Sequence, residues 1–349
     1  MKNKILIWVA IILMSSGKVY SQDIHFSQFF QNQGQLNPSL TGAFNGLGRF
    51  STNYKSQWRN IDKSFQTFAL NADGGFFKNK AYNRNGNFLG LGVNFFTDKA
   101  GVLSLRTTSA LFNVAYNLKI ANGQTLAAGI QAGFIQRSID PTAGEWGIQY
   151  DGNSFNPDYP SGEYISNSKK YVPDFGMGMS YTWTNNEKNP SRDWTLLLGV
   201  GAFHVNKPNQ TLFLNSEDKL HVKINPHLKL NIPLNKNEFI IPQMMYSFQG
   251  PSQELIVGFD FRHFLSFDSQ HTDFIKQSAI FGSLYFRNSD AIIAGVGYMY
   301  SGFQAGISYD INISKLSLAS HYQGGLEVSL TYIIRGTARS RIESRSSFE

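Results

Sequence analysis

Apolar and polar residues alternate along much of this chain. The clearest run is residues 221–232, HVKINPHLKLNI, in which every second residue is apolar. Its apolar face consists of Val222, Ile224, Pro226, Leu228, Leu230 and Ile232. Its polar face consists of His221, Lys223, Asn225, His227, Lys229 and Asn231. Because successive side chains of a β-strand point to opposite faces of a sheet, this period of two predicts an amphipathic strand.

The same alternation recurs along the chain and predicts fourteen strands. They cover residues 49–58, 65–72, 89–95, 108–118, 126–134, 175–183, 194–202, 221–232, 240–248, 255–262, 280–287, 291–300, 302–311 and 325–334. Turn residues punctuate the runs, as in Ala121-Asn122-Gly123, where Asn-Gly is a strong hairpin signal. The pattern therefore indicates an antiparallel, all-β chain.

The predicted connections differ in length according to the side on which they fall. The long loops 138–170, 206–219 and 312–322 all fall on one side, and the short turns 119–124, 233–237 and 301–302 on the other. The long polar stretch 73–87 falls on the short-turn side and is the exception. Barrels of outer membranes have long outer loops and short periplasmic turns, so the long-loop side is expected to be extracellular.

Composition decides whether the apolar faces meet a protein core or lipid. Charged residues make up only 16% of the chain, aromatic residues make up 14%, and Gly numbers 32. A soluble protein usually has about 25% charged residues, and no mature segment contains the 18 consecutive apolar residues of a membrane helix. We therefore predict a transmembrane antiparallel β-barrel of about fourteen strands with both termini periplasmic. A secreted two-sheet sandwich is the alternative fold.

The first 21 residues differ from the rest of the chain. Lys2 and Lys4 precede a short apolar run, and residues 19–21 (VYS) suit a cleavage site before Gln22. This pattern predicts a secretory signal peptide at 1–21, with an N-terminal membrane anchor as the alternative. Loss of Lys2, Lys4 and Lys18 lowers the formal charge from +7 to +4. So mild a charge gives no indication of nucleic-acid binding, and the expected location is the outer membrane of a Gram-negative cell.

Three further regions follow from the pattern. Residues 22–48 are rich in Gln, Asn and Phe without clean alternation, and we expect them to form a non-strand, plug-like segment at or inside the barrel mouth. Residues 49–335 are expected to form the barrel. Residues 336–349 form a Ser/Arg-rich basic tail, in which Arg339, Arg341 and Arg345 follow Arg335. A disordered tail and a tail that docks on an acidic periplasmic partner both fit this composition.

Short motifs near both ends of the chain resemble a known family. They are DIHFSQF at 23–29, NPSLTG at 37–42, NYKSQW at 53–58, SYDIN at 308–312 and GGLEVSLTY at 324–332. Together they resemble the PorP/SprF family, outer-membrane proteins of the type IX secretion system of Bacteroidota. The resemblance implies partners among secretion and gliding components. Some members of the family serve a secreted adhesin that carries a C-terminal sorting domain, whereas others belong to the core periplasmic machinery, and both roles remain open for this chain. Between about 60 and 300 only the barrel periodicity supports it.

The chain offers few candidates for chemistry. Its seven His residues are scattered, and no protease, nucleophile-elbow or phosphate-loop spacing occurs. We therefore expect no enzyme activity, no cofactor and no metal site. The family motifs instead single out candidates for partner binding, namely His25, Phe26, Asn37, Pro38, Gly42 and Trp58. A second candidate is a luminal basic stripe that would attract an anionic ligand or line a solvated wall, formed by His221, Lys223, His227 and Lys229.

Two functions remain open at this point. The first is a non-enzymatic barrel that binds, anchors or helps export a secreted surface protein, in contact with lipid and lipopolysaccharide. The second is a diffusion porin or small-solute transporter. Strand periodicity is the same in both, whereas an occupied lumen favours the first and an open lumen favours the second.

Overall fold

The computed structural model describes residues 25–57, 65–78, 86–156, 158–162, 168–185, 193–213, 216–267, 276–314 and 323–335. The predicted signal peptide, Trp58 and the tail 336–349 lie outside this part of the chain. Within it, no helix is long and apolar enough to cross a bilayer.

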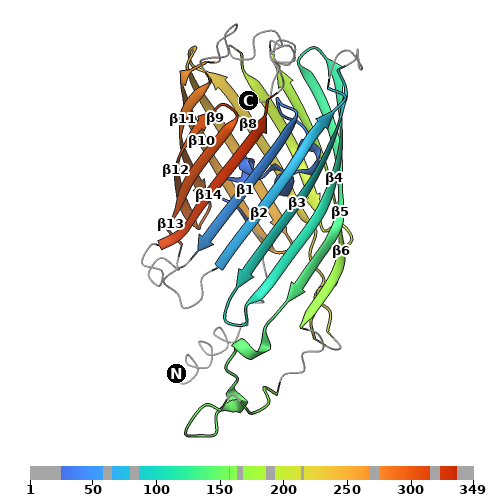
Figure 1. The fold of residues 1–349 in the computed structure, drawn as a ribbon, viewed down its shortest axis with the longest axis vertical. Helices are drawn as coiled ribbons and strands as arrows, with labels where there is room; N and C mark the ends of the chain where they lie inside the picture. Colours follow the sequence, from blue (N-terminus) through green and yellow to red (C-terminus); the bar gives the residue numbers. More distant parts are fainter. Residues whose placement is uncertain are drawn as a thin grey trace, which may run out of the picture.

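Fourteen antiparallel strands close into a barrel, as the alternation predicts (Figure 1). They are β1 (Gly48–Gln57), β2 (Phe65–Phe76), β3 (Phe88–Ala100), β4 (Leu105–Ala121), β5 (Gln124–Ser138), β6 (Lys169–Thr184), β7 (Thr195–Phe203), β8 (Lys223–Pro233), β9 (Glu238–Gln249), β10 (Ser252–Ser266), β11 (Ser278–Arg287), β12 (Ala291–Tyr300), β13 (Phe303–Asn312) and β14 (Gln323–Ile334). Each strand pairs with its sequence neighbours, and β14 pairs with β1 from Gly48↔Ile334 to Gln57↔Gly325. Closure leaves no strand edge unpaired, as the hydrocarbon of a bilayer requires.

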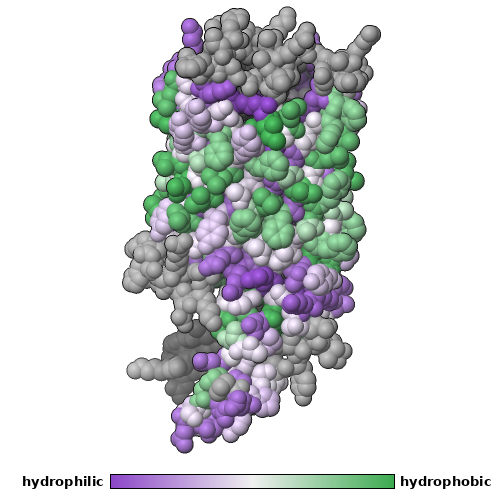
Figure 2. Space-filling model, viewed as in Figure 1, coloured by the Kyte–Doolittle hydropathy of each residue, from purple (hydrophilic) through white to green (hydrophobic). Residues whose placement is uncertain are grey.

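The two faces of the wall differ as the sequence predicts. On β1, Phe50 and Tyr54 are exposed, whereas Arg49, Asn53 and Lys55 point inward and are buried. Repeated around the wall, the outward apolar side chains form a hydrophobic belt between two hydrophilic rims (Figure 2). The belt is suited to lipid, and the rims to the headgroups on either side.

Strand β8 contains the clearest alternation of apolar and polar residues in the chain. Ile224 is exposed, whereas Asn225 and His227 are buried inside the barrel. The partners of Leu228 on the neighbouring strands, Leu198 and Met244, are both exposed. Leu228 therefore belongs to the lipid-facing side of the wall.

Replacing Leu228 with Arg is expected to impair membrane assembly. An Arg that faces the middle of a bilayer costs about 2–4 kcal/mol. Replacing Lys229 with Gln, on the luminal face one residue away, leaves assembly intact. The heat-dependent shift of the folded barrel on a denaturing gel measures both variants. Equal assembly of the two would show that the inside and outside faces have been assigned wrongly.

The connections place the two ends of the barrel. The two longest connections, 139–168 and 204–222, join strand ends on one side of the barrel. The turns 122–123, 234–237 and 301–302 join strand ends on the other side, together with the intermediate connections 77–87, 185–194 and 267–277. We assign the first to the outer side and the second to the periplasm. Several expected boundaries were wrong: the stretch predicted as a loop from Asp73 begins as part of β2, which ends at Phe76, and β6 begins at Lys169, before its predicted start at 175. Asp73 is buried and paired with Arg49, which holds this polar stretch in the wall.

The described residues before β1, 25–47, lie inside the barrel (Figure 1). It forms three short helical turns, η1 (Phe29–Gln31), α2 (Gln33–Leu36) and η2 (Pro38–Leu40). Gly48 and its partner Ile334 both lie at the periplasmic end. From Gly48 back to His25 the segment runs through the lumen, so that His25 reaches the outer ends of β10 and β11 at Glu254 and Arg287.

Candidate functional site in the barrel lumen

Apolar side chains of residues 25–47, which we call the luminal segment, pack on one side of the barrel interior. Their core contains Phe29, Phe30, Leu36 and Leu40 from the segment and Met245, Ile256, Tyr285 and Ile293 from strands β9 to β12. The Phe29 ring lies 4.9 Å from that of Phe30 and meets Tyr285 edge-on at 5.9 Å between ring centroids. Full burial of one such side chain stabilises a structure by about 1.5–3 kcal/mol, so this contact holds the segment against the wall.

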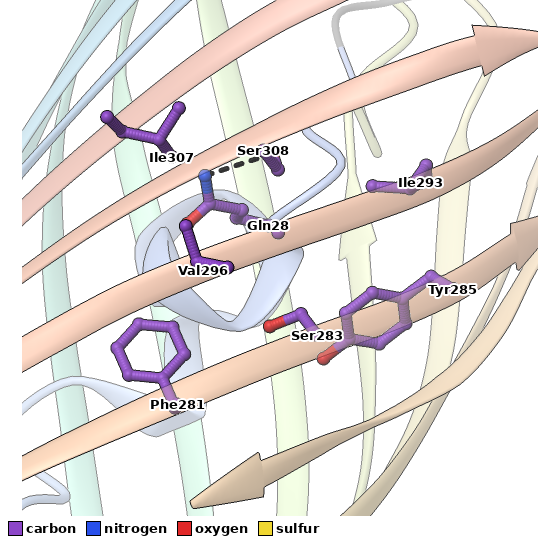
Figure 3. Close-up of a pocket in the computed structure, with 9 residues that line it drawn as sticks. Gln28, Phe281, Ser283, Tyr285, Ile293, Val296, Ile307 and Ser308 are labelled. Atoms are coloured by element: carbon purple, nitrogen blue, oxygen red, sulfur yellow. Dashed lines mark hydrogen bonds between the residues drawn. The ribbon is translucent and has the colours of Figure 1, made fainter.

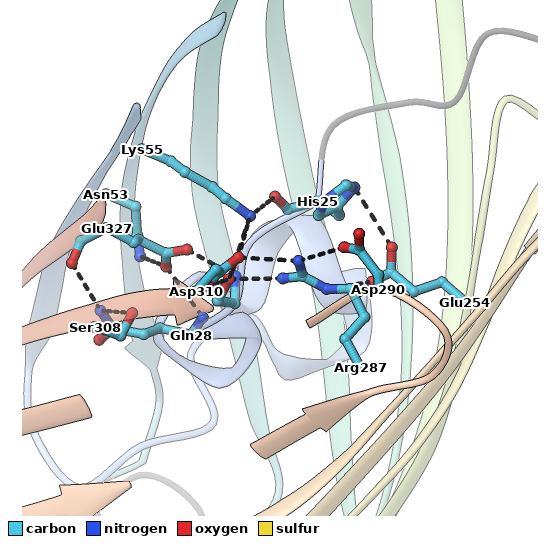
Figure 4. A network of polar contacts seen from close by, with 11 residues as sticks. His25, Gln28, Asn53, Lys55, Glu254, Arg287, Asp290, Ser308, Asp310 and Glu327 are labelled. Carbon is cyan, nitrogen blue, oxygen red and sulfur yellow. Dashed lines mark hydrogen bonds and ion pairs between the residues drawn. The ribbon is translucent and has the colours of Figure 1, made fainter. Parts of the chain in front are cut away.

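A buried cluster of charges lies beside this core, toward the outer end (Figure 4). Arg287 Nη1 lies 2.9 Å from Asp310 Oδ2, and Lys55 Nζ lies 3.5 Å from the same oxygen. Each of these three side chains is almost fully buried, as is Glu327. Buried charges are costly unless they are paired and hydrogen-bonded, so their remaining partners matter.

The luminal segment supplies those partners. Ser27 Oγ donates to Asp310 at 2.7 Å and accepts from Arg287 Nη2 at 2.6 Å. The backbone N–H of Ser27 donates to Glu327 Oε2 at 2.7 Å. Gln28 adds a contact to the neighbouring wall, where its Nε2 donates to Ser308 Oγ at 3.1 Å. Polar groups of the segment therefore supply hydrogen bonds to three of the buried charges of the wall, Arg287, Asp310 and Glu327.

His25 extends the cluster toward strand β10. Its Nδ1 lies 3.4 Å from Glu254 Oε2, and its carbonyl oxygen accepts from Lys55 Nζ at 3.3 Å. Burial, followed by the positive charges of Lys55 and Arg287, holds the pKa of His25 well below its ordinary value. His25 is therefore neutral at neutral pH.

Asn37 and Pro38 hold the middle of the segment. Asn37 Nδ2 donates to the Met179 carbonyl of β6 at 2.9 Å, and Asn37 Oδ1 accepts from the backbone N–H of Ser39 at 2.9 Å. The second bond caps η2, where Pro38 occupies a first-turn position that needs no N–H donor. Ser39 Oγ meets Ser180 Oγ at 2.9 Å. The Asn-Pro pair thus sets a turn and attaches it to the wall.

Gly42 allows the segment to pass close to strands β2 and β3. Its φ is +74°, in the left-handed region that favours glycine. A Cβ at this position would lie 2.8 Å from Gly90 Cα and 2.9 Å from the Gly74 carbonyl oxygen. The N–H of Gly42 donates to Asp73 Oδ2 at 2.7 Å. A larger residue is therefore excluded both by its backbone angle and by contact with the wall.

Lys78 fastens the segment at the periplasmic end. Its Nζ donates to the carbonyl oxygens of Phe44 at 2.6 Å and Gly46 at 3.3 Å. It also lies over the Phe44 ring, 4.4 Å from the centroid. Burial, with a smaller effect from the positive charge of Arg49, lowers the pKa of Lys78 from 10.5 to about 7.

The free energy of unfolding is expected to rise with pH through the titration of Lys78. Between about pH 7 and the ordinary lysine pKa of 10.5 the unfolded chain keeps a proton that the folded chain has lost. The expected gain across this window is a few kcal/mol. Urea unfolding followed by tryptophan fluorescence measures it, and Lys78→Met should remove this part of the slope. An identical slope in Lys78→Met would contradict the assignment.

The other predicted residues fall in several places. Phe26 is buried with Ala69 and Phe96. His227 and Lys229 lie under the segment, where the Phe30 ring is 5.9 Å from the His227 ring and 5.5 Å from Lys229 Nζ.

The predicted basic stripe is therefore divided. His221 precedes β8, and its carbonyl oxygen accepts from Gln249 at 3.4 Å at the outer rim. Lys223 is the first residue of β8. The luminal segment covers His227 and Lys229, so the structure does not present the four side chains as one open wall.

Sequence reasoning missed the charged residues that the segment binds. Lys55, Asp310 and Glu327 occur within the family motifs, and Arg287 ends a predicted strand. The sequence did contain a signal that these four residues are functional, because each is a charged residue at an inward position of a membrane-facing strand. Such charges are costly and need a buried partner.

A small cavity lies beside the segment. A cavity of about 10 Å³ lies between Gln28 and strands β11 to β13, lined among others by Ser283, Tyr285 and Ser308 (Figure 3). This is at the lower limit for one water molecule. Among the described residues no group of His, Cys, Asp or Glu is arranged to hold a metal ion. The site therefore has the character of a packed contact between segment and wall.

Comparison with known proteins identifies the family. The family model of the type IX secretion system membrane protein PorP/SprF matches residues 18–332. The chain belongs to the PorP/SprF family. This membership and the barrel fold place it in the outer membrane as a component of type IX secretion. A comparison with curated proteins finds no match.

Solved barrels are similar to this PorP/SprF protein in fold. The toluene transporter TbuX of Ralstonia pickettii is 10% identical, with a TM-score of 0.48 over 85% of this chain and 92% of that one. A FadL homologue of Pseudomonas aeruginosa is 9% identical, with a TM-score of 0.44 over 85% of this chain and 92% of that one. Likeness at this level concerns the barrel alone and says nothing of what this chain binds.

Proposed function

We propose that this PorP/SprF protein is a non-enzymatic barrel that binds, anchors or helps export a secreted cell-surface protein. The secreted protein is an adhesin recognised through its C-terminal sorting domain. Other components of the type IX secretion or gliding apparatus are further partners, and lipid and lipopolysaccharide surround the wall. No chemical step is required of the barrel.

The occupied lumen is the observation that supports this proposal most. A diffusion porin needs an open path, whereas residues 25–47 are packed against the inner wall by an apolar core and a buried charge cluster. Removing the segment would expose Arg287, Asp310 and Glu327 without their segment partners. This cost favours a lumen that stays filled, and hence a binding role over solute passage.

The luminal segment also contributes to the proposed binding of a secreted protein. Its outer end, at His25, lies beside Glu254 at the start of β10, on the side where a secreted protein is met. We infer that the segment closes the barrel and contributes the floor of the partner-docking surface. His25, Phe26, Asn37, Pro38 and Gly42 would then act by holding the segment in place.

A strain that lacks this chain tests the proposal. Its surface proteins are compared with those of the parent strain by mass spectrometry, and its uptake of small solutes is measured in parallel. The proposal predicts the loss of one or a few secreted surface proteins with unchanged solute uptake. A normal surface proteome with impaired solute uptake would favour the porin instead.

A further inference from the structure

The outer connection between β5 and β6 is a projection that carries exposed apolar side chains. Its described residues, 139–156 and 158–162, extend well past the end of the barrel wall (Figure 1). Ile148 is 65% exposed and Tyr150 57%, and Phe155 and Tyr159 are exposed as well. Exposed apolar side chains that lie close together on a protein surface often mark an interaction site.

Hydrogen bonds hold the projection together while these four side chains stay exposed. Gln149 is buried, its Nε2 donates to the Tyr159 carbonyl at 2.7 Å, and its own carbonyl accepts from the N–H of Asn156 at 2.9 Å. Trp146 Nε1 donates to the Pro141 carbonyl at 3.2 Å. The apolar side chains are therefore presented on a preformed frame, which lowers the entropy lost on binding.

All of the charges on this projection have one sign. Residues 139–168 contain five acidic residues and no Lys, Arg or His. Of those described, Glu145 and Asp158 are exposed. The other two described acids are Asp140 and Asp151. Asp140 accepts a hydrogen bond from Thr142, and Asp151 accepts one from the N–H of Ser154. These bonds lower the pKa of each carboxyl group and keep both carboxylates charged. The rest of the mature chain carries a net positive charge, so this patch is a local feature.

We propose that this projection is the docking platform for a cationic, aromatic-bearing segment of the secreted partner. The inference rests on the proposed function and names the surface that would carry it. The apolar cluster supplies the anchor, and the acidic frame selects a positively charged segment and raises its rate of encounter. An anionic lipid surface would be repelled, and a neutral saccharide would gain nothing from four carboxylates of one sign.

Peptide binding to the purified full-length barrel tests the platform. The probes are a fluorescent octapeptide of alternating Lys and Trp and its counterpart of alternating Glu and Trp, in about 0.1 M and about 1 M salt, where the Debye length falls from about 10 Å to about 3 Å. The lysine peptide is expected to bind at least about tenfold more tightly at the lower salt, with the preference lost at the higher salt. Equal binding of both peptides would overturn the proposal.

Matched variants separate the apolar and the charged contributions. Ile148→Ser with Tyr150→Ser is expected to weaken the lysine peptide about tenfold. Glu145→Gln with Asp158→Asn should reduce the preference for lysine over glutamate about fivefold. Glu217→Gln, an exposed acid on the neighbouring outer loop, is the control and should change neither value. Wild-type binding in both double variants, or tighter binding of a neutral oligosaccharide than of the lysine peptide, would overturn the proposal.

The same variants separate this inference from the proposed function. If the Glu145→Gln, Asp158→Asn barrel recovers the secreted protein from membranes as well as the parent does, the docking platform is wrong and the function stands. If the parent barrel itself recovers no secreted protein, the proposed function fails whatever the peptides do.

Discussion

Replacing Asp310 with Ala is expected to lower the free energy of unfolding by about 3–5 kcal/mol. Asp310 is 2% exposed and is shared by Arg287 and Lys55. Its loss leaves two positive charges in the lumen without their nearest carboxylate, and Ser27 without its acceptor. A buried charge that loses its partner retains its desolvation cost, which makes the effect large.

Asp290 provides a matched control on the same arginine. It lies 3.0 Å from Arg287 Nη1, almost the distance of Asp310, but its side chain is 41% exposed. Asp290→Ala should therefore cost no more than about 1 kcal/mol. Urea unfolding of the refolded barrel measures both variants, and similar small losses would contradict the buried-cluster account.

A single cysteine reports whether the segment itself is released. The chain contains no Cys, and Ala43 is buried within the luminal segment. Thiol labelling of Ala43→Cys should be slow in the parent background and faster with Asp310→Ala. Unchanged labelling would indicate that the cluster stabilises the wall without holding the segment.

Deleting residues 25–44 is expected to turn a closed barrel into a conducting one. Side chains fill the interior of barrels of about eight strands, whereas sixteen to eighteen leave an aqueous channel. Fourteen strands lie between these limits, and here the luminal segment occupies the space. In planar bilayers the parent should stay near the baseline, and the deletion should show stepwise openings with a several-fold higher mean conductance.

A second deletion controls for truncation itself. Residues 336–349 come after β14 in the sequence, which ends at Ile334. Their removal should leave the conductance at the parent level. A closed barrel after deletion of 25–44 would show that wall side chains, such as the Phe239–Phe264 cluster, close the lumen without the segment.

The barrel could be predicted from the sequence because its two environments impose a simple pattern. Lipid requires apolar residues on the outer face, and the interior accepts polar ones, so the alternation within each strand shows which of its faces points outward. All fourteen predicted strands occur. Strands β12 and β13 are joined by the tight connection expected at Ser301-Gly302. The observed β2 extends past its predicted end because Asp73 is paired inside the wall with Arg49.

The path of the luminal segment could not be read in the same way. Its contacts join residues about 300 positions apart, as in Ser27 with Glu327, and no periodicity encodes them. Part of the inner wall also departs from the polar face that alternation suggests. Met245, Ile256 and Ile293 are buried against the segment, and Ile241 is buried with Phe239 and Phe264 of the wall. The adjacent apolar pairs Ile240-Ile241, Met244-Met245 and Ile292-Ile293 were the available signal of a filled interior.

The family motifs acquire a physical meaning from these contacts. DIHFSQF contains His25, Ser27 and Gln28, which bind the wall charges, and NPSLTG contains the turn and the close approach at Gly42. The motifs near the other end of the chain supply Asp310 and Glu327. Residues far apart in the sequence thus form two sides of one contact.

Native isolation of the barrel from outer membranes, followed by mass spectrometry, tests the central claim most directly. The tagged chain is recovered in mild detergent from cells that secrete normally, with the Asp310→Ala variant in parallel. A secreted surface protein and other type IX components are expected to co-purify with the parent barrel, and to be depleted with the variant. Recovery of the parent barrel alone, from cells whose surface proteins are normal, would contradict the account.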